Sequence, residues 1–127
     1  MTILYLTQYN RGMMNEKMTD TVEKLKQELR RGVIVVAVMN CLQESQYGYA
    51  LLKTLNDKGF EISQDTLYPL LRRLEEQELL QSEWRVDDPR PRRYYQLNQS
   101  GVAVYDILKT EWKEMDEVIR RMINENE

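Results

Sequence analysis

The side chains best suited to bind phosphate are concentrated in one short segment, from Arg85 to Arg93. Its nine residues hold four arginines and two aspartates, a local net charge of +2 in a chain whose net charge is −3. Guanidinium groups bind phosphate oxygens through paired hydrogen bonds, and few carboxylates are near them in sequence. The spacing therefore predicts that this segment contacts a nucleic-acid backbone, through Arg90, Arg92 and Arg93.

Enzymatic chemistry has little support in the residue types present. The chain has no histidine and one cysteine, Cys41, which removes the commonest general base and every zinc site built on those two ligands. Its five glycines are scattered and form no phosphate-binding loop. Acidic residues are frequent but fall on predicted helix faces, where solvation explains them. We expect no enzyme, no cofactor and no metal.

The location of the protein is indicated by its apolar segments and its cysteine. The longest apolar run, Val33 to Met39, has seven residues, against about 20 needed to cross a bilayer. No secretory signal is recognisable at the N-terminus. Cys41 cannot form an intramolecular disulfide and is interpreted as a small buried hydrophobe. We expect a cytoplasmic protein that does not contact membranes.

Three helices are predicted before the arginine-rich segment. A capping box at Asp20, completed by the glutamate three residues later, predicts a first helix that reaches about Glu44. Its second half is apolar nearly all round, which is typical of burial between other elements. After a break at residues 45–48, a short second helix is expected from Tyr49 to Lys58, with Gly59 as its C-terminal stop.

The third helix has two different faces. It is expected to begin at Ser63 or Asp65 and to end near Gln77, and Pro69 falls in its first turns. Four leucines cluster on one side of the helical wheel: Leu67, Leu70, Leu71 and Leu74. The other side carries charged and polar groups, with Arg72 and Glu76 opposite the leucines and Tyr68 and Arg73 flanking them. One face is predicted to pack and the other to bind.

The residues that follow change to the period of a strand. Leu80 to Val86 alternates between apolar or small and polar side chains, which predicts a strand. The sequence DDPRPR is typical of a turn, and RYYQL from Arg93 to Leu97 is expected to return as a second strand. The arginines are therefore placed at the tip of a two-stranded hairpin.

The last predicted helix carries an apolar stripe that needs a partner. Its members are spaced by three and four residues, close to a heptad: Val104, Leu108, Trp112, Met115, Ile119 and Met122. This spacing predicts a dimer interface. We expect the chain to be organised as an N-terminal arm of unknown role (1–19), a DNA-binding domain (20–97) and a dimerisation helix (98–127).

Three helices followed by a hairpin are the element order of a winged helix-turn-helix, whose third helix enters the major groove of DNA. The expected fold is mainly α with a small β-hairpin, extended by a long C-terminal dimerisation helix. The chain also resembles the PadR family of bacterial regulators, in the segments YGYALLKTL, SQDTLYPLLRRLEEQELL and RRYYQLNQSG. It is most similar to the shorter members, which have a single helix after the wing. One departure is Glu78, at a position that is often glycine in the family.

The resemblance implies a homodimeric repressor that binds an operator and is released by a small molecule. The residues that match the DNA-contacting part of the family's third helix are Ser63, Gln64, Thr66, Tyr68 and Arg72, and the adjacent Arg73 is expected to contact DNA with them. Hydroxyl groups suit phosphate near a helix N-terminus, glutamine suits adenine, and arginine suits guanine or phosphate. Structural alternatives stay open: Ser63 as a helix cap, Tyr68 as a packing residue, and Arg72 and Arg73 as partners of nearby glutamates.

Two readings also stay open for the last helix. In some of the short PadR-like proteins, an aromatic residue at the place of Trp112 sandwiches flat hydrophobic compounds against its two-fold mate. The resemblance implies a site for planar aromatic or drug-like effectors, formed by Leu108, Trp112, Met115 and Asp116. The alternative is that Trp112 belongs only to the dimer core. At the level of the whole protein, the alternative to DNA binding is a winged-helix adaptor that binds other proteins.

Overall fold

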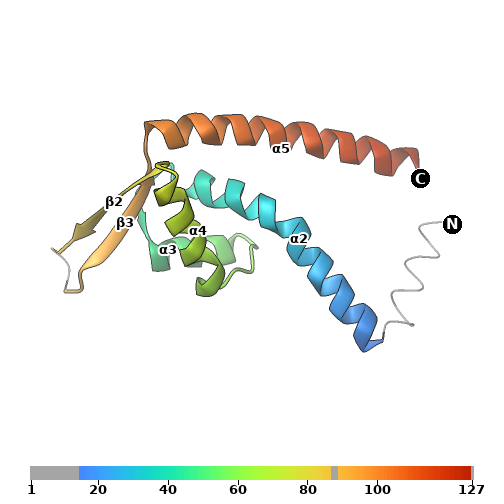
Figure 1. Cartoon of the computed structure of the whole chain (residues 1–127), viewed down its shortest axis with the longest axis horizontal. Coiled ribbons are helices and arrows are strands. Elements are labelled where there is room, and N and C mark those ends of the chain that lie inside the picture. The colour runs from blue at the N-terminus through green and yellow to red at the C-terminus, as the bar shows by residue number, and fades with distance from the viewer. Residues whose placement is uncertain (1–14, 87–88, 127) are drawn as a thin grey trace. The chain divides into compact units, whose positions relative to one another are not determined.

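The computed structural model describes residues 15–86 and 89–126. Figure 1 shows the element order. The elements are α2 (Glu16–Cys41), β1 (Gln46–Tyr47), α3 (Gly48–Asp57), α4 (Gln64–Glu76), β2 (Leu80–Arg85), β3 (Arg92–Leu97) and α5 (Gln99–Glu125). This order confirms the mainly helical winged-helix class. Most of the predicted N-terminal arm, and both aspartates of the predicted turn, lie outside the described residues.

The chain divides into two units. Residues Val33–Thr110 form one of them and contain the hydrophobic core, and the remainder forms the other. In the core, all four leucines predicted on one face of α4 are buried. The second half of α2 contributes Val38 and Met39, while Val33 to Ala37 are only half-buried, so burial there is less complete than its apolar sequence predicts. Cys41 packs against this core, and burial raises the pKa of its thiol.

Helix α2 begins earlier than the capping box predicts. Asn15 precedes its first residue and accepts a hydrogen bond from the backbone N–H of Met18 at 2.9 Å, as an N-cap does. Asp20 lies inside the helix and pairs with Lys24 across one turn at 3.0 Å. The predicted cap at Asp20 was therefore wrong, because an acidic residue followed by glutamate also occurs on the solvated face of a helix.

The hairpin belongs to a three-stranded sheet, so the prediction of two strands was incomplete. Strand β1 pairs antiparallel with β3, and the sheet order is β1-β3-β2. Tyr47 lies opposite Tyr94, and the hairpin partners run from Leu80 with Leu97 to Arg85 with Arg92. A strand of two residues has no detectable period. It forms because β3 supplies the backbone hydrogen-bond partners, and β3 is too distant in the sequence for a local pattern to predict the pairing.

Helices α3 and α4 end in the same backbone motif with different residues. In both, the last turn is closed by backbone hydrogen bonds of the Schellman type, from Phe60 to Leu55 (2.9 Å) and from Leu79 to Leu74 (3.0 Å). The motif requires a residue with positive φ. Gly59 supplies it after α3 with a φ of 107°, which confirms the predicted stop, and Glu78 supplies it after α4 with a φ of 61°.

Replacing Glu78 by glycine is expected to raise the free energy of unfolding by about 1 kcal/mol, because glycine adopts this φ without the Cβ clash. Gln77 is the matched control, since its φ of −78° is ordinary and Gln77→Gly should lower stability. Urea unfolding followed by circular dichroism measures both. Equal destabilisation by the two changes would contradict a strained Glu78.

A tight junction joins the end of α4 to the start of α5. The Asn98 side chain accepts a hydrogen bond from the backbone N–H of Gly101 at 2.8 Å and donates one to the carbonyl of Glu78 at 2.8 Å. Gly101 is buried against the backbone carbonyl of Leu79. Further along α5, Tyr105 accepts a hydrogen bond from Asn40 of α2 at 2.6 Å. These contacts anchor the first turns of α5 to the winged helix.

Two searches of the described residues bear on other classes of function. None of their helices combines the length and apolar character required to cross a membrane. Within the same residues, Cys, Asp and Glu side chains nowhere gather in threes as a metal site would require.

Candidate nucleic-acid interface

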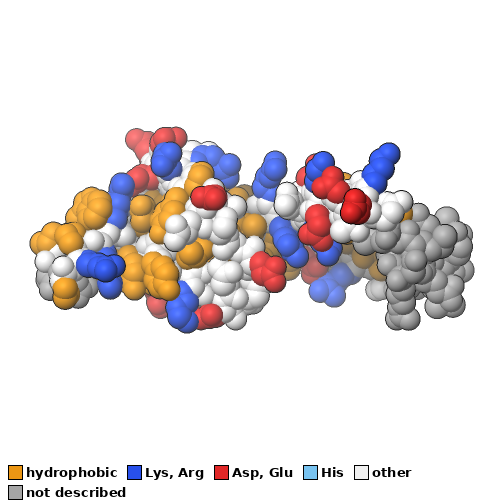
Figure 2. All heavy atoms as spheres, turned by 90° about the horizontal axis from the view of Figure 1, so that it is seen from below, with side chains coloured by type: hydrophobic (Ala, Val, Ile, Leu, Met, Phe, Trp, Pro, Cys, Tyr) orange, Lys and Arg blue, Asp and Glu red, His pale blue; other side chains and the backbone are white. Residues whose placement is uncertain are grey.

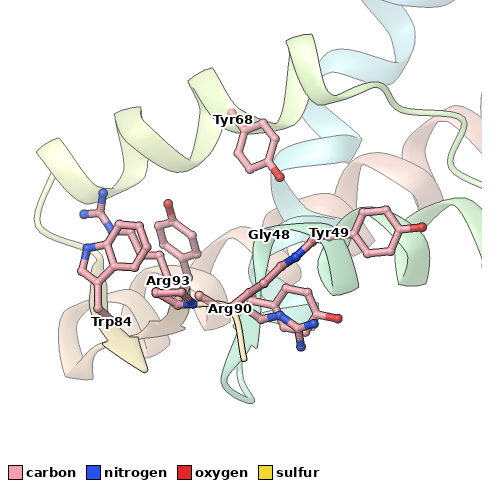
Figure 3. A pocket seen from close by; sticks show the side chains of 10 residues that line it. Gly48, Tyr49, Tyr68, Trp84, Arg90 and Arg93 are labelled. Atoms are coloured by element: carbon pink, nitrogen blue, oxygen red, sulfur yellow. The ribbon is translucent and has the colours of Figure 1, made fainter. Parts of the chain in front are cut away.

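A hollow of about 550 Å³ opens between the wing, which we define as β2, β3 and the residues between them, and helices α3 and α4. Figure 3 shows its lining, which combines aromatic rings with guanidinium groups. The lining residues are Tyr47, Gly48, Tyr49, Tyr68, Trp84, Arg90, Pro91, Arg92, Arg93 and Tyr95. No carboxylate lines the hollow among the residues that the structure describes, so this lining suits an anionic ligand such as a nucleic-acid backbone.

Tyr68 forms the α4 side of the hollow. Its ring points toward the start of α3 (Figure 3) and lies so close to Gly48 that a Cβ there would be 2.6 Å from the Tyr68 Cε1 atom. A side chain at Gly48 would displace this ring. Among the described residues, no partner is found for the Tyr68 hydroxyl. Tyr68 therefore packs through its ring and keeps its hydroxyl available. The packing role and the DNA-contacting role considered from the sequence are compatible with each other.

Arginines stack on tyrosines along the sheet. The guanidinium of Arg85 lies 3.9 Å from the centre of the Tyr94 ring, and that of Arg92 lies 4.4 Å from the centre of the Tyr47 ring. The two tyrosines meet edge to face at 5.5 Å. Such stacking restrains the side chains while leaving guanidinium edges able to donate hydrogen bonds. Arg85 also pairs with Glu83 at 2.9 Å.

Arg93 is held by α4. Its Nη2 atom donates to both carboxylate oxygens of Glu75 at 2.7 Å, and its Nε atom donates to the Ser82 hydroxyl at 3.2 Å. The Ser82 hydroxyl in turn donates to Glu75. Burial raises the pKa of the neighbouring Tyr95, so its phenol stays neutral near pH 7. The expectation that few carboxylates lie near Arg93 was wrong, because Glu75 reaches it from 18 residues away.

The first turn of α4 presents the polar side chains that the family resemblance selects. Ser63, Gln64 and Thr66 are all exposed. Ser63 occupies the N-cap position with extended backbone, but its side chain makes no capping hydrogen bond and lies 3.5 Å from the Thr66 hydroxyl. These side chains stand outside the lining of the hollow. They extend the candidate surface from the hollow along α4.

Arg72 and Arg73 lie on different flanks of α4. Arg72 is exposed and near enough to Tyr95, on the wing side, to affect its pKa. Arg73 instead lines a second hollow on the α2 and α5 side of the same unit, among Val35, Met39, Leu74, Gln77, Leu79, Val104 and Leu108. Ion pairs of Arg72 or Arg73 with Glu75 or Glu76 are not found in the described part of the chain.

Substituting each of these arginines by glutamine tests the two flanks. Arg72→Gln is expected to weaken binding to a duplex containing the operator about tenfold, since an arginine facing DNA is worth about 1–3 kcal/mol. Arg73→Gln changes the same charge on the far flank and is expected to stay within twofold of the wild type. Fluorescence anisotropy with labelled DNA measures both. Equal losses would place both arginines at the DNA.

Several lining residues were not singled out from the sequence. Tyr47 and Tyr49 lie in the segment YGY, and Trp84 and Tyr95 alternate in the strands, so all four read as ordinary packing aromatics. In the structure Tyr49 and Trp84 are 59% and 65% exposed, which is unusual for side chains of this size. One feature of the sequence could have indicated these residues: several aromatic side chains lie close to the arginines, more than packing of the core requires.

The stripe on α5 behaves differently at its two ends. Val104 and Leu108 are half-buried against the core. Trp112 is 37% exposed, and Met115, Ile119 and Met122 are about half exposed. Asp116, expected to attract cations, accepts a hydrogen bond from Arg120 at 2.9 Å, and this contact raises the pKa of Arg120. Its carboxylate therefore already has a cation on the same helix.

Comparisons with known proteins agree with this arrangement. The family model of PadR-like transcriptional regulators matches residues 38–107. A PadR family transcriptional regulator from Eggerthella lenta superposes with a TM-score of 0.78 at 39% identity, covering 86% of this chain and 97% of that one. A transcriptional regulator from Clostridium thermocellum gives 0.67 at 26% identity, covering 74% and 96%.

A relative outside the solved structures agrees as well. The transcriptional regulator Rv3488 of Mycobacterium tuberculosis is 32% identical over 97 residues, which are 76% of this chain and 88% of that protein. Members of this family are transcriptional regulators and not enzymes. The matched residues include the helix-turn-helix, the wing and the start of α5. The chain therefore belongs to the PadR-like family of transcriptional regulators.

Proposed function

We propose that this regulator is a homodimeric repressor that binds an operator through the hollow between the wing and α4, together with the first turn of α4. The observation that carries the proposal is the lining of that hollow, where the aromatic rings of Tyr49, Tyr68 and Trp84 lie beside the guanidinium groups of Arg90 and Arg92. Figure 2 views the molecule from below relative to Figure 1, and at the wing end hydrophobic and Lys or Arg side chains lie next to one another. A surface of this kind suits sugar and phosphate groups.

The roles of the side chains differ within this interface. We assign phosphate contacts to Arg90 and Arg92, with the hydroxyls of Ser63, Thr66 and Tyr68 in support, and base contacts to Gln64 and Arg72. Arg73 faces the other flank. Arg90 and Arg92 give two phosphate contacts per protomer, and Arg72 raises this to three where it meets phosphate as well as a base. For a dimer, the slope of log affinity against log salt is about −4 to −5.

The dimer is proposed from the exposed apolar stripe on α5. Side chains as large as Trp112, Met115, Ile119 and Met122 rarely remain exposed together on a helix that has no partner. A second copy would cover them, with residues 20–97 left as the DNA-binding part and 98–127 as the dimerisation helix. The two-fold symmetry of such a dimer matches a near-palindromic operator.

The effector proposal rests on the same stripe. Leu108, Trp112 and Met115 supply apolar and adaptable contacts for a planar aromatic compound. Because Asp116 is paired with Arg120, a cationic compound would have to share the carboxylate with that arginine. A regulator of this kind would act in the cytoplasm, where its DNA is.

Footprinting of the purified protein on the DNA that flanks its gene tests these statements together. A protected, near-palindromic site that is lost when a planar aromatic compound is added would support the dimeric repressor, and transcription from that promoter in vitro should then fall when the protein is added. Failure to shift any flanking DNA at low salt would instead favour the adaptor that binds proteins.

A further inference from the structure

The contact between Arg93 and α4 has a role of its own in DNA binding. We infer that Glu75, Ser82 and Arg93 form a clamp that positions the wing against α4, and that Arg93 acts on DNA through this clamp and not by contacting phosphate. The inference rests on the proposed function, because it concerns how the two DNA-binding elements keep their spacing. It replaces the phosphate contact that the sequence predicts for Arg93.

The clamp closes a ring of hydrogen bonds between α4 and both strands of the wing, β2 and β3. The Nη2 atom of Arg93 lies 2.7 Å from both Glu75 oxygens and 3.0 Å from the Ser82 hydroxyl, so its two hydrogens are shared among three acceptors. Nε of Arg93 donates to Ser82 at 3.2 Å, and Ser82 donates to Glu75. The side chains of Arg93 and Glu75 are 39% and 29% exposed, so solvent reaches the pair only in part. A charged contact that is supported by a third side chain, Ser82, has a more defined geometry than a single exposed ion pair.

The position of the clamp explains why the wing needs it. The base of the wing is anchored by Leu80 and Leu97, which are buried in the core. Toward the tip the strands lose such anchors, since Trp84, opposite Arg93 in the register, is mostly exposed. The clamp therefore attaches the middle of the wing to α4. Arg90, near the tip, depends on this anchor for its position relative to the major-groove helix.

The two interpretations of Arg93 predict opposite changes in DNA affinity when the negative charge of Glu75 is removed. If Arg93 contacted phosphate, Glu75 would compete for it and repel DNA, so Glu75→Gln would tighten binding. If the clamp positions the wing, Glu75→Gln breaks it and weakens binding, although it removes a negative charge from the interface. Removing a negative charge near DNA should by itself raise affinity. If affinity falls instead, the residue acts by positioning other groups.

Binding of a labelled operator duplex to the full-length protein is measured over a range of salt concentrations. Glu75→Gln and Arg93→Gln are each expected to weaken binding about tenfold, the double variant no more than either single one, and the slope against log salt is expected to stay at the wild-type value. Glu76→Gln is the matched control on the adjacent residue. It should leave binding unchanged or tighten it up to about threefold, as loss of a like charge does.

Tighter binding by Glu75→Gln, or a slope that is shallower by about 1.8 for Arg93→Gln in the dimer, would overturn the inference in favour of phosphate contact. A readout without DNA keeps the test independent of the proposed function. In a Trp112→Phe background, where Trp84 is the remaining tryptophan, Glu75→Gln should lower the time-resolved anisotropy of Trp84 and Glu76→Gln should not. Unchanged anisotropy would overturn the clamp even if no DNA is bound.

Discussion

Replacing Gly101 by alanine is expected to lower the free energy of unfolding by about 3 kcal/mol, which is the largest stability effect that the structure predicts for a single methyl group. The added Cβ would overlap the backbone carbonyl oxygen of Leu79 and would lie 3.1 Å from Cδ2 of Leu97. A backbone group cannot rotate aside as a side chain can. The first turn of α5 would have to move, and the hydrogen bond between Gly101 and Asn98 would lengthen or break.

Gly32 provides the control for this prediction. It also lies inside a long helix, α2, but no atom of the described residues comes within 4 Å of the Cβ that alanine would add. Gly32→Ala should therefore raise stability by up to about 1 kcal/mol through helix propensity alone. Both variants are compared by urea unfolding followed at 222 nm. Equal stabilisation by the two changes would contradict the close approach of α5 to Leu79.

Replacing Arg90 by glutamine is expected to reduce operator affinity roughly 50-fold at about 0.1 M salt, the largest single effect expected on DNA binding. The estimate follows from the loss of one phosphate contact per protomer, or two per dimer, at about 0.9 in the salt slope for each. The slope should become shallower by about 1.8. Non-specific DNA should lose affinity by a similar factor, because a phosphate contact carries no sequence information.

The control for Arg90 is an arginine of the same charge that is not among the residues of the proposed interface. Arg120 is exposed on α5 and paired with Asp116, and Arg120→Gln should leave operator affinity within about twofold. An unchanged salt slope for Arg90→Gln would show that Arg90 does not meet phosphate. Loss of affinity for the operator alone, with non-specific binding intact, would assign Arg90 to base recognition instead.

The acidic net charge of the chain makes these arginines more important than they would be in a basic protein. With a net charge of −3, long-range attraction to DNA is weak, and affinity must come from contacts at the interface. A wing held at a defined distance from α4 supports such contacts, since each phosphate has to be met at the right place. The clamp and Arg90 then contribute to the same binding surface, but only loss of Arg90 is expected to change the slope of log affinity against log salt.

The sequence alone determined the elements whose signal is local. The spacing of the leucines in α4 predicted both the helix and its buried face, because side chains at intervals of three and four residues must share one side of a helix. The alternation from Leu80 and the prolines after it predicted the hairpin in the same way. The motif around Tyr68 also identified the PadR-like family, which the family model confirms.

Only the tertiary structure decided features that depend on partners distant in the chain. Strand β1 is too short to have a period and exists because β3 is beside it. Helix α4 is followed by a residue with positive φ, as glycine often provides, but this residue is Glu78, so the motif could not be recognised in the sequence. The four clustered arginines look alike in sequence, yet in the structure Glu75, 18 residues away, binds Arg93, and the ring of Tyr94 lies against Arg85. Charge type is a property of the residue, but what a charge can bind is decided by the neighbours that folding brings to it.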